Sequence, residues 1–422
     1  MSSDDASERR REIGRRVARW RVRRGLTRRQ FAELCERSLS WVDKVESGER
    51  GLLRLPMLER VAYVLYVSVK TLADTPEVRQ ARHCMDLFEI SAIQSAMQSY
   101  QAVSREFVPS VAELDTPSDL DRLAQQVTYA QTVFENTHWS LLGQVLPRLL
   151  TTAQIAVVAY PGADDQARRA RSLLSLAYQV TALTLSRLDE FDLTWLAAER
   201  GFVLAEETGD SLLIGAATRQ AVRALMFLER YDESLEFARA GIDRMEPARG
   251  GGSSAYLSLY GLLFLAGAVT AARAKKPAVA RDLLDEGRGV ARQLGHDSID
   301  NEYFCSFGPT EVNLYRAAAW RLLGDGAGVL NASRQVSSDD LSRLRKDRRS
   351  SYHVDLAWGH SLAGHPDDAA RALLTTEKLF PDVVRCWPLA LDLLDHLRRS
   401  ASGTRARELT QLATRAGLAD YA

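Results

Sequence analysis

Four side chains near the N-terminus have the chemistry to recognise another molecule by hydrogen bonding and apolar contact. Leu39, Ser40, Asp43 and Lys44 provide a branched alkyl group, a hydroxyl, a carboxylate and an ammonium group. Residues three and four positions apart on a helix lie side by side, so these four would share one surface. We call this surface the recognition face.

The surrounding segment, Leu26 to Gly48, predicts two short amphipathic helices joined by a tight turn. Thr27 and Ser38 are placed to cap the free amides at the starts of these helices. Helical spacing predicts the inward-facing residues Phe31, Ala32, Leu34 and Cys35 in the first helix and Val42 and Val45 in the second. The recognition face then points away from the core, as a helix-turn-helix presents its second helix to the DNA major groove.

The segment resembles the Xre-type, λ-repressor-like helix-turn-helix family at most of its structural positions. The matching residues are Leu26, Thr27, Phe31, Ala32, Ser38, Val42, Val45, Glu46 and Gly48, and Leu58 to Leu72 matches the closing helix of a five-helix domain. Two positions depart from the pattern, because Glu36 replaces the turn glycine and Arg37 replaces a small hydrophobic residue. The alternative is an ordinary arginine-rich helical bundle.

The resemblance places the recognition face where base-edge contacts are made. There Lys44 could donate to guanine O6 and N7, Leu39 could pack on a thymine methyl group, and Asp43 could accept from cytosine N4. The expected phosphate contacts are Arg15, Arg19, Arg28, Arg29, Trp41 and Arg50. Some of these arginines would instead form a solvated surface, and Trp41 could fill the edge of the core.

The distribution of charge favours DNA as a partner of the N-terminal segment. Residues 1–75 contain 17 Lys and Arg against 11 Asp and Glu, a balance of +6. The whole chain has a formal net charge of zero, so the remainder carries −6. This asymmetry is typical of a DNA-binding module attached to a separate effector body.

The length of 422 residues predicts two or three structural units. Cys35, Cys84, Cys305 and Cys386 are scattered and lack metal-binding spacing, and no signal-peptide pattern is present, so we expect free, mostly buried thiols in a cytoplasmic protein. The uncharged segment 250–272 is apolar but short for a bilayer and contains Ser, Gly and Thr. It predicts a buried helix rather than a membrane span.

A loose repeat of helical hairpins follows from about Thr137. Its turns are expected near Glu190, Tyr231, Lys276, Asp325 and Pro366, roughly 40 to 50 residues apart, each between two apolar-periodic helices. Because such hairpins bury their apolar sides by stacking, the pattern predicts a tetratricopeptide-like solenoid. No alternating strand pattern competes, so the predicted fold class is all-α.

The predicted organisation has three parts. Residues 1–75 form the helix-turn-helix domain, residues 76–136 form linker helices or the first unit of the array, and residues 137–422 form the tetratricopeptide-like body. Helices are expected over 79–103 and 119–135 in the connecting part.

The chain carries no recognisable catalytic or cofactor-binding motif. Zinc-protease, nucleophile-elbow, phosphate-loop and dinucleotide-binding patterns are all missing from the sequence. His353 and His360 could lie two turns apart on one helical face with Asp355 nearby, but metal ligands normally lie three or four positions apart with a third ligand at hand. We therefore expect no enzyme activity, no metal and no cofactor.

Residues 301–325 carry a Gly-Pro-Thr turn, Gly308 to Thr310, which resembles an "FGPT" segment of regulators that join an Xre-type domain to tetratricopeptide-like repeats. A plain helix N-terminus explains the turn equally well. The functional interpretation places Asn313 on the concave face of the array, where its amide could pair with a peptide backbone. Arg219, Arg223 and Tyr178 are the other candidate effector-binding residues.

The whole architecture resembles RRNPP-type regulators. This resemblance implies a cytoplasmic, dimeric transcription factor that binds double-stranded DNA, is not membrane-bound, and senses a signalling peptide or small molecule through its body. Effector binding would change the spacing of the two DNA-binding domains. The alternative is a DNA-tethered adaptor whose array binds a partner protein.

Overall fold

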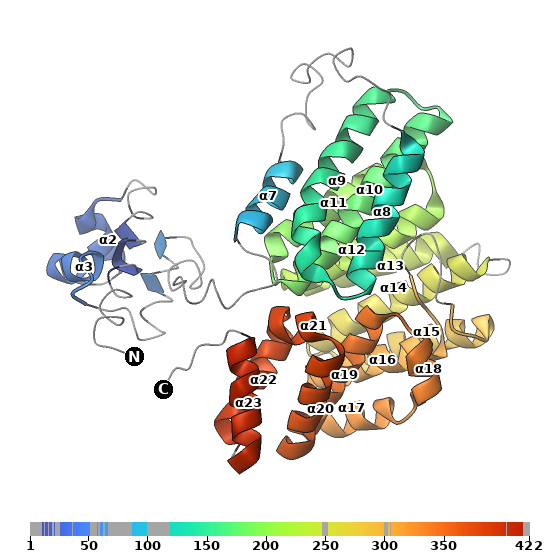
Figure 1. Ribbon diagram of the computed structural model, residues 1–422. Helices are drawn as coiled ribbons and strands as arrows, with labels where there is room; N and C mark the ends of the chain where they lie inside the picture. The colour runs from blue at the N-terminus through green and yellow to red at the C-terminus, as the bar shows by residue number, and fades with distance from the viewer. Residues whose placement is uncertain are drawn as a thin grey trace. The chain divides into compact units, whose positions relative to one another are not determined.

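The computed structural model describes residues 26–35, 37–50, 87–98, 119–246, 252–298, 305–401 and 403–416, with single positions among residues 11–21, among residues 57–65 and at residue 303. These residues form helices and turns and no β-strand, apart from one isolated antiparallel bridge between Ser298 and Phe307. The all-α prediction is confirmed for this part of the chain. The chain divides into two compact units, residues 1–82 with 417–422 and residues 83–416 (Figure 1).

In the N-terminal unit, α2 (Arg28–Leu34) and α3 (Leu39–Glu46) form the two predicted helices. The Thr27 hydroxyl accepts a hydrogen bond from the Gln30 amide at 3.2 Å, and the Gln30 side chain accepts one from the Thr27 amide at 2.9 Å. This is a capping box, which satisfies two free amides at once. The Ser38 hydroxyl accepts from the Trp41 amide at 3.2 Å. Both predicted caps are therefore confirmed.

The core of this unit consists of Ile13, Val17, Phe31, Ala32, Cys35, Trp41, Val42, Val45, Val61 and Leu65. The predicted inward position of Leu34 is wrong, because 52% of this residue is exposed. Phe31 and Ala32 of α2 and its C-cap residue Cys35 are buried, and together they face a direction between those of Phe31 and Ala32. At about 100° per residue, Leu34 lies roughly 110° from that direction, toward solvent.

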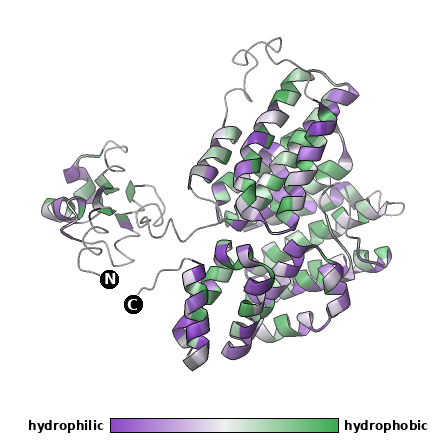
Figure 2. Ribbon diagram, in the orientation of Figure 1, coloured by the Kyte–Doolittle hydropathy of each residue, from purple (hydrophilic) through white to green (hydrophobic). Residues whose placement is uncertain are grey.

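The second unit, which we call the body, consists of helices throughout its described residues. Its helices are α7 (Leu87–Met97), α8 (Leu120–Glu135), α9 (Trp139–Ala159), α10 (Asp165–Arg187), α11 (Phe191–Thr208), α12 (Ser211–Phe227), α13 (Tyr231–Met245), α14 (Ser254–Arg273), α15 (Pro277–Leu294), α16 (Pro309–Leu323), α17 (Gly326–Ser333), α18 (Ser338–Arg343), α19 (Lys346–Leu362), α20 (Pro366–Leu379), α21 (Pro381–Cys386), α22 (Pro388–Ser400) and α23 (Gly403–Arg415). Hydrophobic and hydrophilic residues alternate along most of these helices (Figure 2), as expected of helices that bury one side.

Six hairpins of the body share one kind of turn. One residue just after the first helix of each hairpin has a positive φ between 57° and 80°. It is the first residue after the helix for Gly324 and the second for Thr137, Asp189, Glu229, Lys275 and Gly364. The amide of the following residue donates a hydrogen bond to the carbonyl five residues earlier. Examples are Glu190 to Leu185 at 3.1 Å and Arg230 to Leu225 at 3.0 Å. This pattern is the Schellman motif, which satisfies the last carbonyls of a helix.

The turns lie at the five predicted positions, so the predicted hairpin repeat is confirmed. A further turn at Thr137 joins α8 to α9 in the same geometry. Within the body, α8 is therefore one half of a hairpin, and α7 packs on α9. The Gln154 amide of α9 donates to the Ala96 carbonyl of α7 at 3.0 Å.

The two ends of the array meet inside the body. Arg345, which precedes α19, donates to Glu135 at the end of α8 at 2.7 Å. Arg187 of α10 donates to Ser351 of α19 at 3.1 Å, and the Ser140 hydroxyl of α9 donates to Asp382 of α21 at 3.3 Å. These contacts join residues between 164 and 242 positions apart, so the hairpin stack closes on itself.

Two helices, α9 and α14, are long and apolar enough to cross a membrane by length and composition alone. In α14, 89% of the apolar window is buried inside the body, in a core shared with α12, α13, α15 and α16. The prediction of a buried helix over this segment is confirmed. In α9 the buried share is 44%, and its buried residues pack against α7, α8 and α10.

Among the described cysteines, Cys35 and Cys305 are free and buried, as predicted. Cys386 is disulfide-bonded, which corrects the prediction of a free thiol at that position. Cys84 lies outside the described residues.

Replacement of Gly261 tests the tight packing of α14. A Cβ at this position would overlap the Phe307 ring, whose side chain is fully buried. We expect Gly261→Ala to lower the free energy of unfolding by about 1–3 kcal/mol through overpacking. The control is Gly289→Ala in α15, where an added methyl group meets no atom within 4 Å and helix propensity favours alanine. Denaturant unfolding of both variants measures the difference, and equal stability would contradict the packing described.

Candidate functional sites

The recognition face is exposed on α3, as the sequence predicts. Leu39 is 48% exposed, and Ser40, Asp43 and Lys44 are also exposed. The opposite side of α3 lies in the core, where Val42 and Val45 are almost fully buried. A capped helix with one buried and one free side can enter a DNA groove without unfolding.

A buried carboxylate fixes α3 against its neighbours. Glu46 is 8% exposed and accepts hydrogen bonds from Arg21 Nε at 2.6 Å and from Arg28 Nε at 2.8 Å. Arg21 also donates to the Leu26 carbonyl at 2.7 Å. One carboxylate therefore joins the end of α3, the start of α2 and the helical positions among residues 11–21, which we call the first helical segment.

Arg28 links this buried pair to the recognition face. Its Nε lies 3.5 Å from the Asp43 carboxylate as well as 2.8 Å from Glu46. The hydrogen bond to Glu46 raises the pKa of Arg28, so the guanidinium stays charged. Because Arg28 partly neutralises Asp43, it reduces the repulsion that this carboxylate would exert on a DNA phosphate.

The other candidate phosphate contacts are placed differently. Arg15, Arg29 and Arg50 are exposed, and Arg29 pairs with Glu33 one turn later at 3.3 Å. Trp41 is only 7% exposed and belongs to the core, which fits the core-edge alternative rather than a phosphate contact. Arg19 lies outside the described residues.

Two glycines allow the first helical segment to approach the end of α3 closely. A Cβ at Gly14 would overlap the carbonyl oxygen of Val45 and lie 2.8 Å from that of Glu46. Gly48 has a φ of +80°, and a Cβ there would lie 2.5 Å from the Arg11 Cα. The position of the recognition face therefore depends on backbone contacts that side chains would prevent.

A second candidate site lies inside the body. It is a cavity of about 40 Å³ between α8, α10, α12, α16 and the start of α19. Its charged lining residues are Glu135, Arg187, Arg219, Arg223, Glu311, Arg345, Asp347 and Arg348. Five arginines face three carboxylates, so the lining has an excess of two positive charges.

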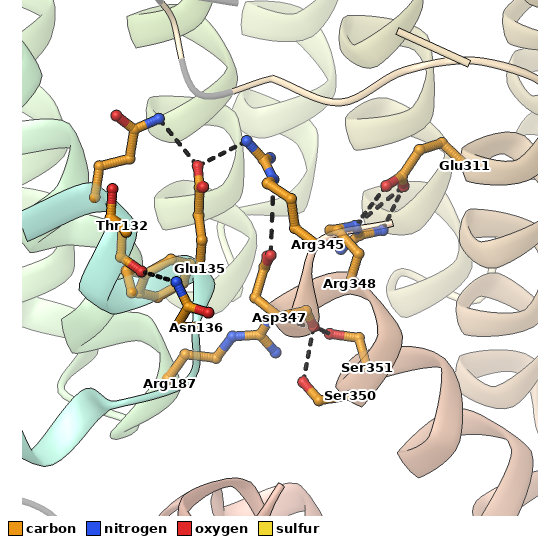
Figure 3. A network of polar contacts seen from close by, with 12 residues as sticks. Thr132, Glu135, Asn136, Arg187, Glu311, Arg345, Asp347, Arg348, Ser350 and Ser351 are labelled. Atoms are coloured by element: carbon orange, nitrogen blue, oxygen red, sulfur yellow. Dashed lines mark hydrogen bonds and ion pairs between the residues drawn. The ribbon is translucent and has the colours of Figure 1, made fainter. Parts of the chain in front are cut away.

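Two of the five arginines are neutralised. Arg348 donates to Glu311 at 2.7, 2.9 and 3.0 Å, and Arg345 pairs with Glu135 at 2.7 Å (Figure 3). Asp347 also approaches Arg345 at 3.8 Å. Burial opposes the charge on Arg348, but the paired Glu311 carboxylate outweighs this effect and raises the pKa of Arg348.

The remaining three arginines form no ion pair with a described carboxylate. Arg187 lies 4.3 Å from the Trp387 ring centroid and 5.5 Å from that of Trp139, and one of its terminal nitrogens donates to Ser351. The Nε atoms of Arg187 and Arg219 are buried without a hydrogen-bond partner. Burial lowers the pKa of Arg187 to about 10, and burial with neighbouring guanidinium groups lowers that of Arg223 to about 9.

The structure separates the four predicted effector residues. Arg219 and Arg223, one turn apart on α12, both line the cavity. Tyr178 does not, because its buried hydroxyl accepts from the Gln154 amide at 3.0 Å near α7. Asn313 is half-buried on α16 and is also not part of the lining. Effector binding by these residues remains a prediction.

The Gly-Pro-Thr turn has a structural role. Pro309 begins α16, and the Thr310 amide and hydroxyl both donate to Asp297, at 3.0 and 2.5 Å. A Cβ at Gly308 would overlap the same carboxylate.

The cavity arginines outside α12 were missed by the sequence reasoning. Arg187 follows Val180 and Leu183 at helical spacing on the buried side of α10, which is a detectable signal. Arg345 and Arg348 carry no comparable signal, because their inward direction depends on the closure of the array. No group of three metal-binding side chains occurs within the described ranges.

Residues 12–74 match the model of a helix-turn-helix domain family. Among similar solved structures is Bacillus thuringiensis PlcR in complex with the peptide PapR7 and DNA, at 13% identity, covering 93% of this chain and 100% of that chain with a TM-score of 0.39. Another is the apo form of ComR from S. thermophilus, at 11% identity, covering 89% and 97% with a TM-score of 0.24. TM-scores this low do not establish a shared fold. No curated protein matches the chain.

The N-terminal unit is thus a helix-turn-helix domain, a class of domain that binds DNA and does not catalyse reactions. The matched domain occupies residues 12–74, and the body that follows is all-helical in its described residues.

The buried Glu46 carboxylate provides a test of how the recognition face is held. We expect Glu46→Gln to destabilise the N-terminal unit by about 3 kcal/mol, because it leaves Arg21 buried beside a neutral group. Glu49→Gln, an exposed control, should change stability by less than about 0.5 kcal/mol. Hydrogen exchange over residues 26–50 in the full chain measures both. Equal protection in the two variants would show that Glu46 does not hold the unit together.

Proposed function

We propose that this protein is a cytoplasmic transcriptional regulator that reads an operator with α3 and is controlled by an effector bound to its body. The observation that carries the proposal is the helix-turn-helix match over residues 12–74, together with a capped α3 whose outward side is exposed. Base contacts are assigned to Leu39, Ser40, Asp43 and Lys44. Phosphate contacts are assigned to Arg15, Arg28, Arg29 and Arg50, all exposed around that helix.

Effector control is assigned to residues 137–422, with a peptide or small molecule as ligand. The enclosed cavity supports this assignment, because it gathers polar side chains from helices that are far apart in sequence. The proposed active form is a homodimer, because half-sites spaced by one helical turn require two coupled domains.

The path of control runs through α8. Glu135 at its end lines the cavity and pairs with Arg345. Helix α8 packs on α9, which also contacts α7, the first described helix of the body. A ligand that alters the Glu135–Arg345 pair would shift α8 relative to α19. That shift would change how the DNA-binding units of a dimer are presented.

Lys44→Ala tests the assignment of base contacts. We expect it to weaken operator binding by about 1–3 kcal/mol and to relax one operator position, with little effect on non-specific DNA. Arg29→Ala should weaken specific and non-specific binding alike and reduce the salt dependence by about one charge. The operator comes from genome-wide footprinting of the tagged protein. Unchanged operator affinity in Lys44→Ala would overturn the assignment of this side chain.

Effector control predicts that a ligand changes operator affinity and stability together. The full chain should respond to the secreted peptides or small metabolites of its own host with a higher melting temperature and a changed operator affinity. Titration of fractionated host extract into purified protein measures both quantities. A stoichiometric partner protein that alone produces the response would instead support the adaptor alternative.

A further inference from the structure

We propose that the cavity at Arg187, Arg219 and Arg223 binds the phosphoryl group of a small anionic effector. This inference rests on the proposed function, because it names the ligand class for the body. The starting observation is the absence of an ion pair with a described carboxylate at all three arginines, although two of them are less than a tenth exposed. We call these three residues the arginine triad.

Burial disfavours the charged forms of Arg187 and Arg223, whereas Cys305 and Tyr315 favour the charged form of Arg219 and raise its pKa. Moving a charged group out of water is unfavourable unless an opposite charge and hydrogen bonds compensate. Arg345 and Arg348 in the same lining receive such compensation from Glu135 and Glu311. The hydrogen-bond partners of Arg187 and Arg219 are neutral: Ser351 for Arg187, and the side chains of Tyr315 and Cys305 for Arg219. The Asp347 and Asp355 carboxylates favour the charge on Arg187, but burial outweighs them.

Two donors of the triad remain unused in the buried state. The Nε atoms of Arg187 and Arg219 have no hydrogen-bond partner, and both line the cavity. The depressed pKa values of Arg187 and Arg223 have the same cause, since burial disfavours their charged forms until an anion is present. Arginine is the side chain best suited to an oxyanion, because its planar fork matches two oxygens at once.

Charge and size select the phosphoryl group among anions. The lining has an excess of two positive charges, and a phosphate monoester carries about −1.5 to −2 at neutral pH with three acceptor oxygens. A volume of about 40 Å³ has room for roughly three water molecules, comparable to one tetrahedral oxyanion and too small for a peptide segment. The remainder of the effector would lie outside, toward the wall formed by the Glu135–Arg345 pair.

The test is equilibrium binding of inorganic phosphate, glycerol phosphate and succinate to the purified full chain by titration calorimetry. We expect the two phosphates to bind and succinate to bind at least about tenfold more weakly. Tighter binding of glycerol phosphate than of inorganic phosphate identifies a phosphorylated metabolite as the source, and the reverse order identifies free phosphate. Succinate binding as tight as that of either phosphate, or no phosphate binding at millimolar concentration, would overturn the proposal.

Variants of α12 locate the site. Arg219→Gln and Arg223→Gln should each weaken phosphate binding by about tenfold or more, since each removes a charge-assisted pair. Arg223→Lys keeps the positive charge, so it should retain more phosphate affinity than Arg223→Gln. It therefore distinguishes loss of the charge from a folding defect. The matched control is Arg316→Gln on α16, an arginine outside the cavity lining, which should bind phosphate as the parent does. Equal affinity in all four variants would overturn the site.

Operator affinity measured with and without phosphate separates this inference from the proposed function. Phosphate binding that depends on the triad but leaves operator affinity unchanged would support the anion site and contradict effector control. Operator affinity that responds to host extract, together with no binding of phosphate, would support effector control and contradict the anion site.

Discussion

Both units of this protein depend on carboxylates that hold arginines from other segments. The carboxylate is buried in the N-terminal unit and half-buried in the body. In the N-terminal unit Glu46 joins Arg21 and Arg28, and so sets the angle between the two helices that present the recognition face. In the body, Glu135 joins Arg345 across 210 residues and thereby closes the stack of hairpins. Hydrophobic burial supplies most of the stability of such helices, but it is not directional. The ion pairs supply the direction, since each is satisfied in only one arrangement.

The closure of the array explains why its interior is charged. A stack of hairpins buries apolar residues between neighbouring helices, and the same turn recurs at each hairpin because every helix end must satisfy its last carbonyls. When such a stack closes on itself, long side chains from its inner helices meet at the centre. Arginine can reach across that space and retain several hydrogen bonds, so a polar centre forms where apolar side chains would be too short to fill the volume.

The repeating features of this fold can be predicted from the sequence, and the features that depend on closure cannot. The helix caps at Thr27 and Ser38, the hairpin turns and the buried α14 all follow from local chemistry, and all were predicted. Leu34 was placed inward because it shares an apolar spacing with Phe31, although the core of α2 faces another direction. Arg219 and Arg223 line one cavity, whereas Tyr178 and Asn313 lie outside its lining, and effector binding by all four stays a prediction. Only tertiary structure shows which arginines of α10 and α19 complete that cavity.

The balance of charge in the body gives a physical route from ligand to DNA. Glu135 and Arg345 form part of the same lining as the unpaired triad, so any anion that enters competes with Glu135 for Arg345. If the anion draws Arg345 inward, α8 loses the contact that holds it to the C-terminal half of the array. If instead the anion neutralises the triad alone, repulsion within the lining falls and the same contact tightens. Either change would move α8, which packs on α9 beside α7, the first described helix of the body, so the direction of regulation depends on which arginine the anion prefers.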